Sequence, residues 1–415
     1  MTDASHDSVV IVGAGQAGVT MAQSLRDAGW SGEIILIGAE HGTPYQRPSL
    51  SKQYLAGHET DDDLILRAPE ALERDGVRYL AGVRVVVIER ELRTILLDTG
   101  ATVRYSDLIL ATGSAPRRLP VPGMDLPGVG VLRSRDDSAS LRARLIDAEH
   151  FVVVGGGFLG LEAAATAAKA GSRVTVLEFD TRLLTRAIGA TAATALAELH
   201  REHGVDIRLE NAVVEFMGDG MLTGVRLSDG SQLSTDLALV AVGASPIVDV
   251  AERAGLTVAD GIVTDSRLRT SDPHIFAIGD CARYPSIHAA ADVRLESVQN
   301  ATDQARFVAS RLVDDAAATA YGSVPWFWSQ QYDRKLQIVG LALPGDDERV
   351  LPATRAGSLA VARVRGEAIV AVETINDPKI HMRARRLLAD GPVDVARIAE
   401  LSATAEEVGT ASAVA

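Results

Sequence analysis

Two glycine-rich segments carry the residue spacing that points most clearly to chemistry. The more complete one has an apolar run at 151–154, G-G-G-F-L-G at 155–160, an alanine-rich stretch, and a second apolar run at 173–177 that leads to Glu178. In a strand–turn–helix–strand context, G-x-G-x-x-G binds a dinucleotide whose phosphates lie at free N–H groups of the helix start. Glu178 stands where an acid accepts hydrogen bonds from an adenosine ribose and repels a 2′-phosphate. The segment predicts a site that prefers NADH to NADPH; the alternative is a bare tight turn.

An earlier segment repeats this arrangement. Residues 9–12 are apolar, residues 13–18 read G-A-G-Q-A-G, and a helix to about Ala28 precedes a strand at 33–38, with Glu40 just beyond its end. One such unit is typical of a dehydrogenase, whereas two indicate a flavin dinucleotide and a nicotinamide dinucleotide in one chain, so that electrons can pass between them. The alternative is a duplicated nucleotide fold with one inactive site.

The elements between the two units indicate how they are joined. Apolar strands at 107–110 and 237–242 each run into a turn of small residues, where a bulky side chain would block a cofactor. We expect these turns to be crossings between domains. A later strand, 275–278, returns the chain to the first domain and ends near Asp280, which could accept a polyol hydroxyl, cap a following helix, or do both.

Composition narrows the class of protein. At 415 residues the chain is too long for one core, and 47% hydrophobic residues are ample for burial. The net charge of −14 argues against nucleic acid as a partner, and no apolar run is long and uncharged enough to cross a membrane. The start lacks the pattern of a signal peptide, and one cysteine excludes a disulfide framework, a C-x-x-C pair and a cysteine-built metal site. The cytoplasm is the expected location.

Several further motifs complete a family pattern. Together with the paired glycine motifs, PYQRPSLSK, AIGDCAR, RLESVQNA and PWFWSQQY resemble the FAD-dependent, NADH-using ferredoxin reductases of bacterial monooxygenase and dioxygenase systems. The resemblance runs from about Val9 to Leu388. One departure is Ser49, where the family usually has a second proline. The serine makes the loop less stiff than a proline would.

The resemblance implies an α/β, glutathione-reductase-like fold with two Rossmann-type dinucleotide-binding domains and a C-terminal α+β domain. The implied division is an FAD domain at 1–114 and 244–323, an NADH domain at 115–243, a C-terminal domain at 324–401, and a disordered tail at 402–415. The implied partner is a small, acidic 2Fe–2S ferredoxin in a transient complex, which serves an oxygenase. No metal, nucleic acid or membrane is implied.

The resemblance also assigns residues to each cofactor. The FAD pyrophosphate would lie on Gly13, Gly15, Ala17 and Gly18, with Glu40 on the adenosine ribose. The rest of the FAD would be bordered by Arg47, Lys52, Val85, Ala111, Arg133, Asp280 (ribityl chain), Val298 and Trp326 (isoalloxazine). NADH would be bound by Gly157, Phe158, Leu159, Glu162, Glu178, Arg186 and Gly243; Arg182 is a neighbouring alternative to Arg186.

The chemistry expected of these parts is hydride transfer from NADH to FAD, followed by single-electron transfer to two ferredoxins. We interpret Lys52 and Glu162 as an ion pair beside the flavin, in which Lys52 stabilises negative charge on the reduced ring and Glu162 orients the nicotinamide carboxamide. Alternatively, Glu162 is an exposed first-turn acid favoured by the helix dipole. Neither residue is expected to be an obligatory proton donor.

The sequence also suggests where electrons leave the protein and where ferredoxin docks. Cys281 is alone, so we expect it to be buried and electrons to leave from the flavin edge. Candidates for ferredoxin docking are basic residues: Arg306, Arg311, Arg334, Lys335, Lys379, Arg383, Arg385 and Arg386. Other functions that the sequence leaves open are a rubredoxin reductase, an NADH oxidase of the same fold, and an NADH-sensing redox-signalling flavoprotein.

Overall fold

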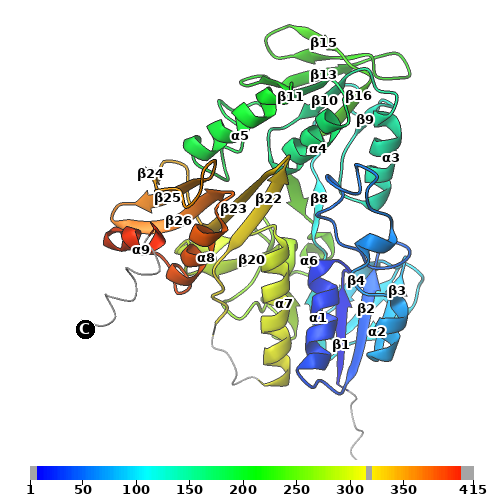
Figure 1. Ribbon diagram of the computed structural model, residues 1–415. Coiled ribbons are helices and arrows are strands. Elements are labelled where there is room, and N and C mark those ends of the chain that lie inside the picture. The colour runs from blue at the N-terminus through cyan, green and yellow to red at the C-terminus, as the bar shows by residue number, and fades with distance from the viewer. Residues whose placement is uncertain (1–6, 315–319, 403–415) are drawn as a thin grey trace, which may run out of the picture. The chain divides into compact units, whose positions relative to one another are not determined.

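The computed structural model describes residues 7–314 and 320–402 (Figure 1). By its internal contacts the chain divides into two compact units. Of the described residues, unit 1 comprises 7–46, 61–115, 245–314 and 320–323, and unit 2 comprises 47–60, 116–244 and 324–402. The predicted disordered tail falls almost wholly outside the described residues.

Unit 1 is built on a five-stranded parallel sheet in the order β19-β7-β1-β2-β3. Its strands are β1 (Ser8–Val12), β2 (Glu33–Gly38), β3 (Val77–Ala81), β7 (Asp107–Leu110) and β19 (Ile275–Ala277). The helices include α1 (Gln16–Asp27), α2 (Pro69–Arg74), α6 (Asp249–Arg253) and α7 (Val298–Val313), with a 3-10 turn at Asp62–Leu64. Every residue of β1 is buried, as expected for a parallel strand covered on both faces.

Further short strands complete unit 1. They are β4 (Val85–Glu89), β5 (Thr94–Leu97), β6 (Thr102–Arg104), β18 (Ile262–Val263), β20 (Ala282–Ser286) and β21 (Ala291–Val293). The interpretation of Asp280 as the cap of a following α-helix, which the sequence left open, is wrong. The chain makes a single 3-10 turn, Gly279–Cys281, and then enters β20.

Unit 2 contains a second five-stranded parallel sheet in the order β12-β11-β10-β16-β9. Its strands are β9 (Val129–Gly130), β10 (Phe151–Val154), β11 (Val174–Leu177), β12 (Asp206–Arg208) and β16 (Leu237–Val240). Helices α3 (Arg135–Leu145), α4 (Phe158–Lys169) and α5 (Ala190–Glu202) and the antiparallel strands β13 (Val213–Met217), β14 (Gly224–Leu227) and β15 (Gln232–Ser234) accompany it. The short strands β8 (Ser114–Pro116) and β17 (Ala244–Pro246) lie at the two predicted crossings.

The C-terminal part of unit 2 is an antiparallel sheet in the order β22-β23-β26-β25-β24, with β27 beside β26. The strands are β22 (Trp326–Gln331), β23 (Arg334–Gly340), β24 (Asp347–Val350), β25 (Leu359–Arg365), β26 (Ala368–Ile375) and β27 (Val393–Asp394). Helices α8 (Pro378–Leu387) and α9 (Ala399–Ser402) and a 3-10 turn at Val395–Ile398 complete it. Buried Val339, Ala362 and Val372 form its core with Ile380 and Leu388.

Residues 47–60 cluster with unit 2, although the predicted domain boundaries include them in the FAD domain. The Ser138 hydroxyl donates to Leu50 O at 2.7 Å, and the Thr166 hydroxyl donates to Ser51 O at 2.8 Å. The Ser49 hydroxyl donates to Glu59 within the same loop. The loop is therefore fixed by α3 and α4, and the serine adds a polar contact where the family pattern has a stiff proline.

Candidate dinucleotide sites and the Lys52–Glu162 pair

The first glycine turn lies at the carboxyl end of β1 in unit 1. A Cβ atom on Gly13, whose φ is +116°, would lie 2.0 Å from Ala111 O, and one on Gly18 would lie 1.8 Å from Gly13 O. A Cβ atom on Gly15, by contrast, would have no atom within 4 Å. Two glycines are thus required by packing, and the third leaves open space where a phosphate could approach the backbone. These residues fit the pyrophosphate of a dinucleotide.

The helices that follow both turns begin without a side-chain cap. Gly15 is the N-cap of α1 and Gly157 the N-cap of α4, and a glycine has no side chain that could cap its own helix. By contrast, Ser134 caps α3 and Ser297 caps α7. An uncapped start leaves backbone N–H groups and the positive end of the helix dipole for an anion, as nucleotide phosphates require.

Other predicted FAD residues lie at the same edge of the unit 1 sheet. In the strand register, Val12 pairs with Leu110, and Leu110 pairs with Ala277, so the turns that follow these strands lie at one edge. Asp280 is half-buried there and accepts a hydrogen bond from the Ser114 hydroxyl at 3.0 Å. Ala111 follows β7 directly at this edge, close to Gly13.

The second turn, in unit 2, has the same construction. A Cβ atom on Gly155, whose φ is +109°, would lie 2.5 Å from Ala241 O, and one on Gly160 would lie 2.3 Å from Gly155 O. Around Gly157 there is again no atom within 4 Å of a Cβ position. Gly243, at the crossing after β16, has φ +100° and equally open surroundings.

Glu178 is held against this turn by two backbone hydrogen bonds. Gly156 N donates to its Oε2 at 2.6 Å and Asp180 N donates to its Oε1 at 2.8 Å. Each carboxylate oxygen keeps a further lone pair for a ribose hydroxyl. The carboxylate therefore has a fixed position beside the proposed phosphate site.

The structure separates the two arginines of the following loop. Arg182 donates to Ile188 O at 2.8 Å and to Thr185 O at 2.9 Å, so its guanidinium closes the loop. Arg186 is exposed. The exposed side chain is the one that a ligand could reach, which favours the predicted Arg186 over Arg182.

Lys52 and Glu162 form the predicted ion pair, with Lys52 Nζ 2.7 Å from Glu162 Oε2. Glu162 is 6% exposed, so the exposed first-turn acid considered from the sequence is not present. Its carboxylate also accepts from the Ser51 hydroxyl at 2.6 Å and from the Ser329 hydroxyl at 2.7 Å. A buried carboxylate is stabilised by hydrogen-bond donors of this kind, and three donors fix its orientation.

Ser51 and Ser329 are site residues that sequence reasoning missed. Ser51 is the neighbour of Lys52 and could have been suspected from that position, but Ser329 lies on β22, far along the chain. The same packing of α4 against β22 brings the Phe158 and Phe327 rings to a centroid distance of 4.5 Å. No single-sequence pattern pairs these residues.

The remaining predicted FAD residues are distributed between the units. Val85 begins β4 and Val298 begins α7, both half-buried in unit 1. In unit 2, Arg47 Nη1 donates to Arg133 O at 2.6 Å. Trp326 lies in unit 2 as well, with the Arg385 guanidinium 4.7 Å from its ring centroid. Their roles toward FAD stay predictions.

The single cysteine is not placed for thiol chemistry. Cys281 is fully buried, its thiol donates to Leu110 O at 3.4 Å, and burial raises its pKa. Within residues 7–314 and 320–402, no group of three or more His, Cys, Asp or Glu side chains is arranged to hold a metal ion. Within the same residues, no helix is long and apolar enough to cross a membrane.

Comparison with known proteins assigns the family. Residues 7–305 match the pyridine nucleotide-disulphide oxidoreductase model, and residues 326–407 match the reductase C-terminal model. The chain belongs to the pyridine nucleotide-disulphide oxidoreductase family. Rhodocoxin reductase from Rhodococcus erythropolis is 43% identical over 383 residues, which cover 92% of this chain and 89% of that protein. The family resemblance and the fold class predicted from the sequence are confirmed.

Solved structures agree along nearly the whole chain. A ferredoxin reductase from Rhodopseudomonas palustris has a TM-score of 0.92 at 40% identity and covers 97% of this chain and 99% of its own. Putidaredoxin reductase, crystallised in covalent complex with putidaredoxin, has a TM-score of 0.92 at 37% identity and covers 99% of both chains. Although the family name includes disulphide, this chain has one cysteine and holds it in the core.

Proposed function

We propose that this protein is an FAD-containing reductase that takes electrons from NADH and delivers them to a small 2Fe–2S ferredoxin of a bacterial monooxygenase or dioxygenase system. The observation that carries the proposal is the pair of open, uncapped glycine turns in a chain whose only thiol is buried. Two dinucleotides without a reactive thiol suit electron transfer through a flavin rather than through a disulfide. The assignment of ferredoxin as the acceptor is supported by ferredoxin reductases that match this chain along nearly its whole length.

The domain assignments are part of the proposal. We assign FAD to the turn at Gly13 and Gly15 in unit 1, with Asp280 on the ribityl chain, and NADH to the turn at Gly157 in unit 2, with Glu178 on the adenosine ribose. When bound, FAD supplies the chemistry: it accepts a hydride from NADH and releases the electrons singly. The chain binds and orients both cofactors, which makes transfer between them effectively unimolecular.

The Lys52–Glu162 pair supplies the local electrostatics in this proposal. Ser51, Lys52 and Ser329 hold the Glu162 carboxylate by three hydrogen bonds, so it cannot turn freely. The Lys52 ammonium keeps further N–H donors for negative charge that develops nearby. Neither side chain needs to gain or lose a proton during the reaction.

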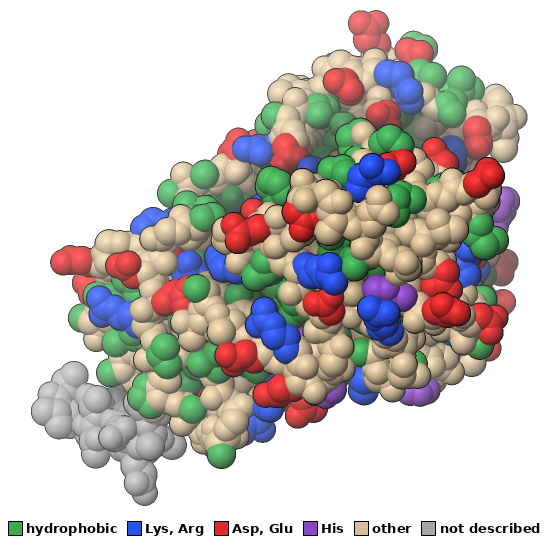
Figure 2. Space-filling view, turned by 90° about the horizontal axis from the view of Figure 1, so that it is seen from above, with side chains coloured by type: hydrophobic (Ala, Val, Ile, Leu, Met, Phe, Trp, Pro, Cys, Tyr) green, Lys and Arg blue, Asp and Glu red, His purple; other side chains and the backbone are tan. Residues whose placement is uncertain are grey.

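Docking of ferredoxin is assigned to basic residues of the C-terminal helix α8. Lys379 and Arg386 are exposed, whereas Arg383 donates to Leu401 O at 3.0 Å and supports α9. Arg311, a docking candidate predicted from the sequence, is 5% exposed and is excluded as a docking residue. On the face drawn in Figure 2, Lys and Arg side chains are interspersed with Asp and Glu. Attraction to an acidic partner must therefore come from a local group of basic residues, such as those of α8.

We assign the reaction to the cytoplasm, where NADH is supplied. The electron acceptor is tested by mixing the NADH-reduced protein with a 2Fe–2S ferredoxin and, separately, with a rubredoxin. Fast reoxidation by ferredoxin and slow reoxidation by rubredoxin are expected. If rubredoxin is the faster acceptor, the ferredoxin assignment is wrong. If neither reoxidises the protein, the signalling alternative is favoured.

A further inference from the structure

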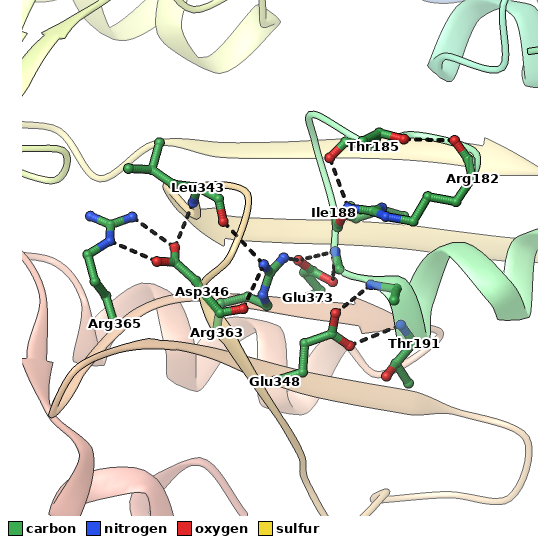
Figure 3. Close-up of polar contacts among 12 residues, drawn as sticks. Arg182, Thr185, Ile188, Thr191, Leu343, Asp346, Glu348, Arg363, Arg365 and Glu373 are labelled. Carbon is green, nitrogen blue, oxygen red and sulfur yellow. Dashed lines mark hydrogen bonds and ion pairs between the residues drawn. The ribbon is translucent and has the colours of Figure 1, made fainter. Parts of the chain in front are cut away.

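A cluster of charged side chains in unit 2 joins the C-terminal sheet to the loop before α5 (Figure 3). Arg363 on β25 and Glu373 on β26 form an ion pair at 2.8 Å, with side chains 5% and 1% exposed. Both oxygens of Glu373 also accept from Gly189 N, at 2.9 and 3.1 Å. A buried ion pair by itself contributes little to the free energy of folding. Because this pair also contacts a loop of the predicted NADH site, its position points to a functional role.

A second carboxylate from the same sheet binds the start of α5. Glu348 on β24 accepts from Ala190 N through Oε1 and from Thr191 N, at 3.0 Å, through Oε2. The helix has no cap from its own N-cap residue, Gly189. Burial alone would raise the pKa of Glu348, but the hydrogen bonds from Thr191 and Ala190 lower it below its ordinary value. The helix start is therefore capped by the C-terminal sheet, in place of a residue of its own segment.

The contact at Gly189 leaves no room for a side chain. A Cβ atom there would lie 2.3 Å from Glu348 Oε1 and 3.1 Å from Arg363 Nη1. The backbone at 189 is thus enclosed between Glu348, Glu373 and Arg363. We call these three side chains the clamp.

The other end of the held loop contacts the second glycine turn. Leu184 N donates to Gly156 O at 3.1 Å, and a Cβ atom on Gly156 would lie 2.5 Å from Leu183 Cδ2. Leu184 has φ +54°, a conformation that a leucine keeps only where its surroundings impose it. Arg182 closes the span between the two ends by its bonds to Thr185 O and Ile188 O. Residues 182–189 therefore form one braced loop between the glycine turn and the clamp, with exposed Arg186 on it.

We propose that Glu348, Arg363 and Glu373 are positioning residues for the dinucleotide: by holding residues 182–189 they place Arg186 and the Gly156–Glu178 contact for the adenosine half of NADH. This inference rests on the proposed function, because it uses the assignment of NADH to the second turn. It gives the C-terminal domain a role in affinity for NADH that is separate from electron transfer.

The test compares two electron donors in the FAD-loaded protein with ferricyanide as the acceptor. Reduced nicotinamide mononucleotide carries the reactive ring of NADH and lacks the adenosine half. In Glu348→Ala, the KM for NADH should rise at least about fivefold, the scale of coupling between linked sites. The kcat at saturating NADH and the KM for reduced nicotinamide mononucleotide should stay at their wild-type values. Glu348→Gln should give a smaller rise, because its amide oxygen can accept one of the two N–H bonds.

The matched control is Glu367→Ala, which removes an exposed carboxylate from the β25–β26 turn of the same sheet and should behave as wild type. In an Arg186→Ala background, the effect of Glu348→Ala should shrink, since the clamp would act through Arg186. An unchanged KM for NADH in Glu348→Ala, or an equal rise for both donors, would overturn the proposal. A failure of the NADH assignment, on which the proposal rests, is distinguishable, because wild-type protein would then not be reduced by NADH at all.

Discussion

The two glycine turns share one construction and differ in how their acids are held. In unit 1, Gly13 N donates to Ile37 O, and in unit 2, Gly155 N donates to Leu177 O, both at 2.8 Å. Ile37 and Leu177 are therefore equivalent, and so are the residues that follow them, Gly38 and Glu178. The acid of unit 1, Glu40, lies two residues beyond the equivalent position.

The side chains around each turn account for this difference. In unit 1 a Cβ atom on Gly38 would lie 2.9 Å from the Ala14 methyl, which fills the space that an acid would need. In unit 2 the turn residue is Gly156, and the Glu178 carboxylate occupies that space. Glu40 is exposed and accepts from the Tyr45 hydroxyl. A carboxylate fixed by backbone hydrogen bonds can discriminate between NADH and NADPH. We therefore expect the acid of the second turn, Glu178, to set the preference for NADH.

The largest effects should separate the packed glycines from the open ones. In Gly18→Ala the new Cβ atom would lie 1.8 Å from Gly13 O, so the free energy of unfolding should fall by about 3 kcal/mol and FAD should be lost. Gly15→Ala meets no atom within 4 Å and should keep its melting temperature without FAD while binding FAD more weakly. Thermal melts of apo and holo protein measure both. Equal destabilisation in the two variants would contradict the packing argument.

Glu178→Ala tests the fixed acid. Loss of the carboxylate leaves Gly156 N and Asp180 N without this partner and removes the repulsion of a 2′-phosphate. The preference for NADH over NADPH, measured as the ratio of kcat/KM values, should fall about tenfold or more. Glu40→Ala is the control and should leave that ratio unchanged. A loss of preference in Glu40→Ala alone would reverse the comparison.

These glycine and acid positions were predictable from the sequence because their spacing is local. The strands that flank the two turns, β1, β2, β10 and β11, read as mainly apolar runs and were predicted within one residue, whereas β16 ends two residues before its predicted end. The three donors to Glu162 and the clamp at Gly189 join residues more than 100 positions apart, and tertiary packing alone brings them together. Arg311 shows the same limit, since burial of a charged residue leaves no local pattern.

Lys52→Met tests a residue that belongs to neither turn. The side chain is 21% exposed, and Ser51 and Ser329 still hold Glu162 in the variant, so the fold should persist. Flavin reduction by NADH should slow by about tenfold or more, the scale expected when a positioned charge is lost. Stopped-flow reduction measures this rate, and bound FAD is measured by absorbance. Complete loss of bound FAD would show that Lys52 binds the cofactor and does not tune it.

The smallest expected effect concerns His381, which lies outside both turns. Burial, and then the charges of Arg385 and Lys335, lower the pKa of His381 to about 4 from 6.5. Between these values the unfolded chain binds a proton that the folded chain does not, so His381 reduces stability as pH falls from 6.5 toward 4. In His381→Gln, the decrease in melting temperature over this range should be smaller than in wild type. An unchanged pH profile would remove His381 as a contributor.

The most direct test of the account is stopped-flow mixing of the FAD-loaded protein with NADH and, separately, with NADPH, followed by a 2Fe–2S ferredoxin. The account predicts fast flavin bleaching by NADH, slow bleaching by NADPH, and rapid reoxidation by ferredoxin. Equal bleaching by both dinucleotides would contradict the role of Glu178. Fast reduction with persistent long-wavelength absorbance and no reoxidation would contradict a ferredoxin reductase.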